Sequence, residues 1–597
     1  MSKKNPIINC HAHVFTGDYV PPYLAKTFLI WPFYYLLSLR AVINCLRWYH
    51  NKIKPFFFTN KVKKIKRWFY ESEIFFRRNY LLGTIKRLAE IYLIVSILFY
   101  VGLWQYDITE PQDTLIGKWV VKALIFIKDS GWIIVVPKLW LKILYLVLVL
   151  IVFKSIRNLA ISVLNIFKIL PGKNFKKLFS RYVQIGMFSK YKTQSRIYQQ
   201  LEKQYPQDTE FIVLPMDMEY MQAGKLKPEF TINSQMEGIL KIKKTNKETC
   251  HPFVFAEPSR MKDKAYFDYE VDKSTGEVSL VKGCLVQEYL EEHDFAGIKM
   301  YPALGYYPFD EELLPLWKYC VQRDLPIMSH CIKGTIFFRG KKKSEWDEHP
   351  IFTEGKIDEA MRKTTEHDKK LDFDIDADYI LEDGKPLYLN EIKNVDFCNN
   401  FTHPLNYLCL LNDELLKKVV SQTKDPRIIN IFYDNDGEYR GEGLSDLKIC
   451  FAHFGGDDQW KRFLESDRDN YTSQLVLKPD KGIDFFMNAS GKPSPGKLAY
   501  VWRYVDWYSI ICSIILQHKN VYADISYILH DEIILPLLKQ TLANDKLQEH
   551  VLYGSDFYVV RNHKSDKELL ADMRAGLSEV EFDQIARENP RAYLNLD

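Results

Sequence analysis

Paired cysteines are missing from this 597-residue chain. No two of its ten cysteines form a C-x-x-C pair; they are Cys10, Cys45, Cys250, Cys284, Cys320, Cys331, Cys398, Cys409, Cys450 and Cys512. Scattered cysteines of this kind exclude a disulfide framework. They are typical of reduced thiols in a cytosolic protein body.

An excess of charge of one sign is also lacking. The chain has 81 basic and 76 acidic residues, a net charge of +5, which is near neutral for its length and gives no indication of a nucleic-acid partner. We expect no signal peptide, because the apolar run after Lys3 and Lys4 is short and leads directly into two histidines. Internal repeats and long low-complexity tracts are absent too. The length predicts two or three folding units, or one large barrel with insertions.

Two histidines stand two positions apart in the stretch IINCHAHVF, residues 7–15. In a strand, residues two apart point to the same face, so His11 and His13 project together where the strand runs into a loop. Two parallel imidazoles are half of a metal site. The fragment by itself more often means two polar residues at a strand end, because an H-x-H pair is a weak signal.

Composition divides the chain into three parts. Residues 1–20 predict one strand and its loop, residues 21–185 are apolar, aromatic and basic, and residues 186–597 alternate strand-like and helix-like runs. In the middle part, residues 132–153 form a 22-residue run with only two charges, which is long enough to span a bilayer. The run at 91–104 is uncharged but shorter.

The charges around these two runs favour a transmembrane hairpin. The connector at 105–114 is acidic, whereas the outer flanks at 60–68, 154–158 and 173–177 are basic, which places both ends of the hairpin on the cytoplasmic side. Residues 24–48 resemble an interfacial helix. We therefore expect a membrane-associated protein with its catalytic body in the cytoplasm. The alternative is a soluble helical insert, buried against a partner or in a homo-oligomer.

Eight strand-like runs that end in polar residues alternate with helical stretches in the rest of the chain. Their positions are 6–15, 210–219, 252–260, 295–302, 325–331, 447–456, 520–527 and 550–557. This rhythm predicts an α/β fold, a closed parallel (β/α)8 TIM barrel. Chemistry in such barrels lies at the carboxyl ends of the strands. The polar residues at five of these ends are His11, His13, His330, His453 and Asp556.

The order of these motifs resembles a known family. H-x-H, "GIK", "LPIMSHC", "FAHFGG", "VYADISY", "YGSD" and a terminal "NPRAYLNL" are similar to the amidohydrolase superfamily, closest to the amidohydrolase-2 branch of metal-dependent hydrolases and decarboxylases. The resemblance covers residues 1–20 and most of 186–597, whereas residues 21–185 have no counterpart in the family pattern. It implies a small-molecule substrate and one divalent metal, zinc or else Mn²⁺ or Fe²⁺.

The same resemblance implies roles for individual residues. His11, His13, His330 and Asp556 would hold the metal, His453 would be the acid or base, and Asp556 would also accept the proton of the attacking metal-bound hydroxide. Three further residues are candidates for substrate binding; they are Lys299, Arg260 and Tyr301.

Two of these candidates have open alternatives. In binuclear relatives a lysine at the position of Lys299 is carboxylated and bridges two metals; here it could instead bind a substrate anion or form a salt bridge in the core. Arg260 suits a carboxylate or phosphate, and equally a surface salt bridge. Tyr301 stands where many relatives have histidine. Asp217 and Asp524 are expected to be supporting or structural.

The insertions fall in barrel loops on the side of the expected active site. Residues 21–185 occupy the first β→α loop, and a charged insertion, about 334–400, occupies the fifth, where we expect a solvated flap. The favoured function is hydrolysis of a C–N or C–O bond in an ester, amide or lactone at a membrane surface, on a small or lipid-like substrate. The alternatives are non-hydrolytic decarboxylation and a membrane-anchored binding or assembly protein.

Overall fold

The computed structural model describes most of the chain, and these residues form two units. The described residues are 4–24, 40–57, 59–105, 114–133, 190–334, 336–357, 380–391, 393–465, 473–488, 490–557 and 564–596, with Tyr35, Leu141 and Asn158. One unit comprises Met1–Ile43 and Phe188–Asp597, and the other comprises Asn44–Met187. The smaller unit therefore follows the first barrel strand in the chain.

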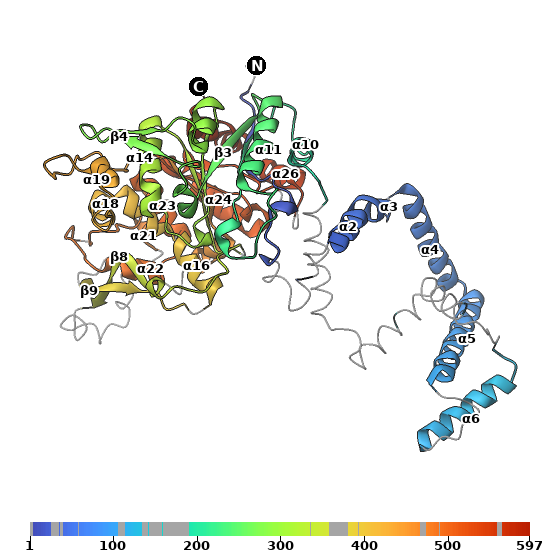
Figure 1. Cartoon of the computed structure of the whole chain (residues 1–597). Helices are drawn as coiled ribbons and strands as arrows, with labels where there is room; N and C mark the ends of the chain where they lie inside the picture. Colours follow the sequence, from blue (N-terminus) through green and yellow to red (C-terminus); the bar gives the residue numbers. More distant parts are fainter. Residues whose placement is uncertain are drawn as a thin grey trace. The chain divides into compact units, whose positions relative to one another are not determined.

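Eight parallel strands form the centre of the larger unit (Figure 1). In their order around the sheet they are β1 (Ile8–Ala12), β2 (Glu210–Val213), β3 (Cys250–Ala256), β6 (Gly297–Met300), β7 (Ile327–Ile332), β10 (Ile449–Gly455), β11 (Val521–Asp524) and β12 (Val551–Leu552). All residues of β1 and β10 are buried, as expected for strands covered on both faces.

Contacts between the first and last strands close the sheet into a barrel. Ala12 forms a parallel bridge with Phe557, and the N–H of Cys10 donates to the carbonyl of Tyr553 at 2.9 Å. The N–H of Asp556 donates to the carbonyl of His11, also at 2.9 Å. The predicted TIM barrel and its eight strands are thus confirmed.

Helices surround this barrel, and several of them were expected from the sequence (Figure 1). The principal ones are α10 (Gln194–Glu202), α11 (Ile232–Thr245), α14 (Leu314–Arg323), α16 (Asn394–Thr402), α18 (Asp413–Val420), α19 (Pro426–Phe432), α20 (Asp457–Leu464), α22 (Lys497–Tyr504), α23 (Trp507–Gln517), α24 (Leu535–Leu542), α26 (Asp566–Gly576) and α28 (Asn589–Leu594). The buried helix α23 begins where the side chain of Asp506 accepts the N–H of Ser509, a standard N-cap.

The insertion in the fifth β→α loop contains an antiparallel hairpin of β8 (Glu348–Ile357) and β9 (Ile380–Tyr388). The base of this hairpin is anchored: Phe352 is buried, and Gly355 lies against the backbone of Gly496 at the start of α22. Residues 358–379, which include much of the charged tract, lie outside the described residues.

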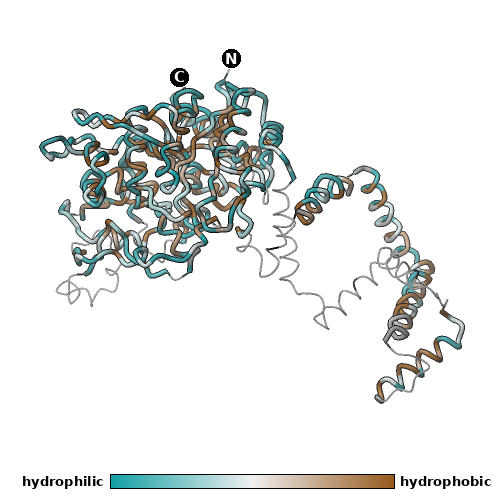
Figure 2. The backbone as a smooth tube through the Cα atoms, viewed as in Figure 1, coloured by the Kyte–Doolittle hydropathy of each residue, from teal (hydrophilic) through white to brown (hydrophobic). Residues whose placement is uncertain are grey.

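The smaller unit is helical. Its main helices are α4 (Asn60–Arg78), α5 (Tyr80–Gln105) and α6 (Leu115–Asp129), preceded by α2 (Arg40–Trp48) and α3 (Lys54–Phe57). Figure 2 shows apolar residues along α5 and α6. Phe99, Leu124 and Ile133 form a small buried cluster within the unit.

These helices do not support the predicted transmembrane hairpin, and the predicted membrane location is wrong. The run at 91–104 lies in α5, whose first half also carries the charged residues Lys86, Arg87 and Glu90. In the part of the chain that the structure describes, no helix combines the length and the apolar character needed to cross a bilayer. The longer run at 132–153 lies almost wholly outside the described residues.

Candidate metal centre

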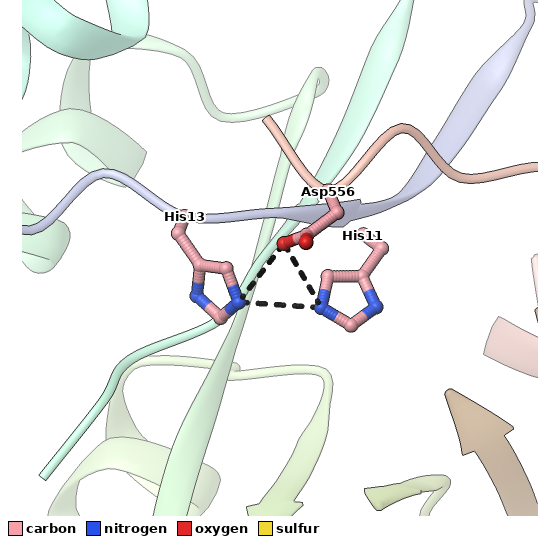
Figure 3. Close-up of side chains that lie close together, drawn as sticks. All are labelled: His11, His13 and Asp556. Atoms are coloured by element: carbon pink, nitrogen blue, oxygen red, sulfur yellow. Dashed lines mark hydrogen bonds and ion pairs between the residues drawn. The ribbon is translucent and has the colours of Figure 1, made fainter. Parts of the chain in front are cut away.

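His11 in β1, His13 directly after β1 and Asp556 after β12 lie together at the carboxyl end of the barrel (Figure 3). Nε2 of His11 is 3.2 Å from Nε2 of His13, and Oδ1 of Asp556 is 3.8 Å from the first nitrogen and 3.6 Å from the second. All three side chains are buried. His11 and His13 are two residues apart at the end of β1, and closure of the barrel brings Asp556 beside them.

Acceptors on the far side of each ring determine which nitrogen carries the proton. Nδ1 of His11 lies 2.9 Å from Oδ2 of Asp524, and Nδ1 of His13 lies 2.9 Å from the carbonyl of Leu214. A carbonyl can only accept, and so can an ionised carboxylate, so each Nδ1 carries the hydrogen. The two Nε2 atoms then face each other with lone pairs, an arrangement that a bound cation between them would stabilise.

Burial keeps these imidazoles neutral. Burial and, to a smaller extent, the positive charge of Lys299 lower the pKa of His13 to about 3. The pKa of His11 is also well below its usual range, again mainly because of burial. Neutral imidazole is the form that binds a metal, so the donor set fits a divalent cation such as zinc.

His330 and His453 form a second imidazole pair beside the first. Nε2 of His453 lies 3.2 Å from Nδ1 of His330, and the rings of His453 and His11 are 4.6 Å apart. Two groups of side chains in the described part of the chain are close enough to hold a metal, one of His11, His13 and Asp556 and one of His11, His453 and Asp524. His330 belongs to neither group, but its Nε2 is buried and has no partner among the described residues.

A serine that the sequence analysis did not select connects these histidines. Oγ of Ser526 is 2.9 Å from Nδ1 of His453 and 3.2 Å from Nδ1 of His11, and it donates to Asp524. Asp524 also accepts the backbone N–H groups of His453 and Ser526. The signal was the stretch "DIS" at the end of β11, where Asp524 and Ser526 share one face as residues two apart.

The backbone at the site is unusual at two of these residues. His453 and Asp556 have φ angles of 67° and 56°, in the left-handed region that non-glycine residues seldom adopt. Such conformations persist only where the surrounding structure compensates for their cost. His453 lies near the end of β10, whereas Asp556 lies in the segment after β12.

Lys299 and Tyr301 lie in the same buried cluster of side chains. The ammonium group of Lys299 is fully buried without a hydrogen-bond partner among the described residues, and burial lowers its pKa to about 8. The ring of Tyr301 stacks on His330 with centroids 3.8 Å apart. The negative charges of Asp524 and Asp556 act on Lys299 from the same pocket, so its charge compensates theirs.

The structure does not bring Arg260 into this group. Its Nε donates to Asp217 at 2.6 Å and its Nη2 donates to Glu219 at 2.6 Å. Its guanidinium also lies 4.9 Å from the ring centroid of Tyr220. Asp217 and Arg260, which both follow barrel strands, thus form an ion pair with each other.

Among known proteins, only solved structures resemble this chain in the three comparisons. No family model matches the chain. The search of curated proteins finds no match either. Solved structures do match. A 2,6-dihydroxybenzoate decarboxylase from Rhizobium is 11% identical, with a TM-score of 0.34, over 67% of this chain and 88% of the other.

Two other solved structures also match. A 5-carboxyvanillate decarboxylase from Novosphingobium aromaticivorans, complexed with manganese, has a TM-score of 0.34 and 11% identity over 67% of this chain and 80% of its own. An amidohydrolase from Mycobacterium avium subsp. paratuberculosis has a TM-score of 0.27 and 12% identity over 68% and 74%. The matched structures are thus two decarboxylases and an amidohydrolase, the enzyme classes that the sequence resembles. At these TM-scores the reaction has to be argued from the site itself.

Proposed function

We propose that this chain is a metal-dependent hydrolase of the amidohydrolase type, which cleaves the C–N or C–O bond of a small-molecule amide, ester or lactone. The observation that carries the proposal is the pair of Nε2 atoms of His11 and His13, 3.2 Å apart beside Asp556, with both ring protons committed elsewhere. Two lone pairs and a carboxylate in one buried place are a costly arrangement without a cation.

His11, His13, His330 and Asp556 would hold the metal. Three imidazoles and one carboxylate suit zinc best, with Mn²⁺ and Fe²⁺ as alternatives that the same donors accept. When bound, a divalent cation supplies Lewis acidity, which polarises a carbonyl group and acidifies water. We expect one metal per chain, with Lys299 as an unmodified amine.

Asp556 and His453 would handle protons. Burial raises the pKa of the Asp556 carboxyl well above its usual range, so this carboxylate is a good acceptor for the proton of the attacking water. His453 donates its Nδ1–H to Ser526, which leaves Nε2 as the basic atom that faces the pocket. The two groups come from different strands and could act on opposite ends of the bond that breaks.

Tyr301 and Lys299 would position the substrate. Burial raises the pKa of the Tyr301 phenol well above its usual range, so the hydroxyl keeps its proton and can donate a hydrogen bond to a substrate oxygen. The buried cation of Lys299 stabilises negative charge that develops near Asp556. Arg260 has no part in this assignment, because its donors already bond to Asp217 and Glu219.

The test is elemental analysis of the purified full chain, combined with a screen of amides, esters, lactones and aromatic carboxylates. The expected result is one zinc, manganese or iron per chain and turnover of one of the first three classes. Absence of stoichiometric metal after reconstitution would overturn the proposal. Turnover of a carboxylate with release of carbon dioxide would replace hydrolysis by decarboxylation, and two metals per chain would indicate that Lys299 is carboxylated.

A further inference from the structure

A lysine follows barrel strand β7 directly at the face that carries the metal centre. Lys333 is three residues after His330 and is exposed to solvent. In the described part of the chain it makes no hydrogen bond and no ion pair. Its ammonium group lies 5.5 Å from the ring centroid of Trp507, a contact that holds the charge at the mouth of the barrel.

The segment that carries Lys333 lies against the site. A Cβ atom added to the next residue, Gly334, would be 3.1 Å from Nε2 of His330 and 3.4 Å from the hydroxyl oxygen of Tyr301. Trp507, under Lys333, packs against Gly455, two residues after His453. Gly334 and Trp507, the two residues next to Lys333 in space, therefore lie against residues of the metal centre or its strands.

The other groups around Lys333 include hydrogen-bond donors. His403 lies with its ring centroid 5.2 Å from that of Trp507. Nδ1 of His403 accepts the N–H of Leu405, so the ring proton is on Nε2, which is buried and has no partner among the described residues. The charges of Lys333 and Arg462 both lower the pKa of His403, after the effect of burial.

The charges that act on Lys333 have both signs. Burial and the positive charge of Arg462 lower its pKa, whereas Asp458, Glu391 and Asp396 raise it. These carboxylates act on the lysine through space, since none of them forms an ion pair with it in the described residues. The ammonium group thus remains open to an anion that arrives from solvent.

We propose that the substrate carries an anionic group, a carboxylate or a phosphate, away from the bond that is cleaved, and that Lys333 binds this group while His403 supports it. Gly334 leaves room for the substrate between Lys333 and the pair of Tyr301 and His330. This inference rests on the proposed function, because it places the reacting end of the same substrate at the metal centre. It narrows the substrate class to acids with two polar ends.

The experiment compares two probes that differ only in one remote charge, terephthalate and 4-carbamoylbenzoate. Their affinities for the zinc-loaded full chain are measured by calorimetry. The wild type should bind terephthalate about tenfold to hundredfold more tightly, since a hydrogen bond to a charged group contributes in that range. Lys333→Met should abolish this preference and Lys333→Arg should retain it.

Lys341→Met is the matched control, because Lys341 is an exposed lysine of the same loop insertion. It should leave the preference unchanged. The proposal is overturned if the wild type shows no preference for terephthalate, or if the preference survives in Lys333→Met. Zinc content is measured on the same samples: absence of zinc from the wild type contradicts the proposed function, whereas a zinc-loaded protein without the preference contradicts only the assignment of Lys333.

Discussion

At the scale of single residues, the two ring nitrogens of each histidine have different tasks. In His11, Nδ1–H donates a hydrogen bond to Asp524, which leaves Nε2 free to bind a ligand. In His453, Nδ1–H donates to Ser526 in the same way. Partners of this kind fix the orientation and tautomer of metal-binding histidines and raise their basicity. The chemistry of the centre therefore depends on β11 as much as on the strands that carry the histidines.

The roles of His453 and His330 can be separated by substitution. His453→Asn should keep the metal and lower kcat by about 10²–10⁴-fold, since general acid–base groups contribute in this range. His330→Ala should lose the metal itself. Metal content by elemental analysis and kcat on the best substrate are the two measurements. Release of metal from His453→Asn would make His453 a ligand and contradict the assignment.

Asp524 is expected to act on the metal without touching it. Asp524→Asn removes the charged acceptor of the His11 Nδ1 hydrogen, so metal affinity should fall about 10- to 100-fold. Competition with a chelator measures that affinity. Asp506→Asn, a change at another buried aspartate, outside the centre, is the control and should leave it unaltered. Equal affinities in the two variants would show that Asp524 is only structural.

At the scale of secondary-structure elements, α23 packs beneath the site with a buried carboxylate at its start. Asp506 accepts both the N–H and the hydroxyl of Ser509 at 2.7 and 3.0 Å. Burial nevertheless raises the pKa of Asp506 from 3.8 to about 6. The cap of this helix is therefore also a group whose ionisation affects stability.

The stability of the barrel should change with pH through Asp506. Its folded-state pKa, about 6, is above the unfolded value, so the folded protein binds this proton more tightly. The stabilisation is complete below about pH 4 and is lost as the pH rises through 6. Two pKa units correspond to about 3 kcal/mol. Asp506→Asn keeps a capping oxygen but does not titrate.

Chemical denaturation of the wild type and Asp506→Asn at pH 4 to 7 tests this expectation. The free energy of unfolding of the wild type should fall relative to that of the variant as the pH rises, by up to about 3 kcal/mol. A difference that stays constant over this range would show that the Asp506 pKa is the same in the folded and unfolded states.

At the scale of the whole molecule, every proposed site residue belongs to one unit. That unit combines Met1–Ile43 with Phe188–Asp597, while Asn44–Met187 forms the other. The barrel has its own core and closes through β1 and β12, which come from opposite ends of the chain. The helical unit contributes no strand to it.

Replacing residues 44–187 with a flexible glycine–serine linker should therefore leave a folded, metal-binding barrel. Metal stoichiometry and a single cooperative unfolding transition are the measurements, with the full chain as the reference. An insoluble product, or one that binds no metal, would show that the barrel depends on the helical unit. Retention of both properties would assign the metal centre to the barrel alone.

The sequence was most informative where the fold repeats a simple rule. The carboxyl ends of all barrel strands lie at one face of the barrel, so the polar residues at the ends of the strand-like runs could be grouped without any structure. That rule found His11, His13, His330, His453 and Asp556. It did not select Ser526, which lies two residues past the end of β11 and shares a face with Asp524. The membrane location was wrong, since no helix in the described part of the chain is both long and apolar enough to cross a bilayer.

The sequence by itself determined the barrel and the residues that line its carboxyl ends, because strand periodicity and strand order are local properties of the chain. Only the tertiary structure decided the partners. Asp524 bonds to His11 from a strand 513 positions away, and Arg260 bonds to Asp217 and not to a substrate. Such contacts depend on the register of the closed barrel and on side-chain rotamers, and neither is encoded in a pattern of neighbouring residues.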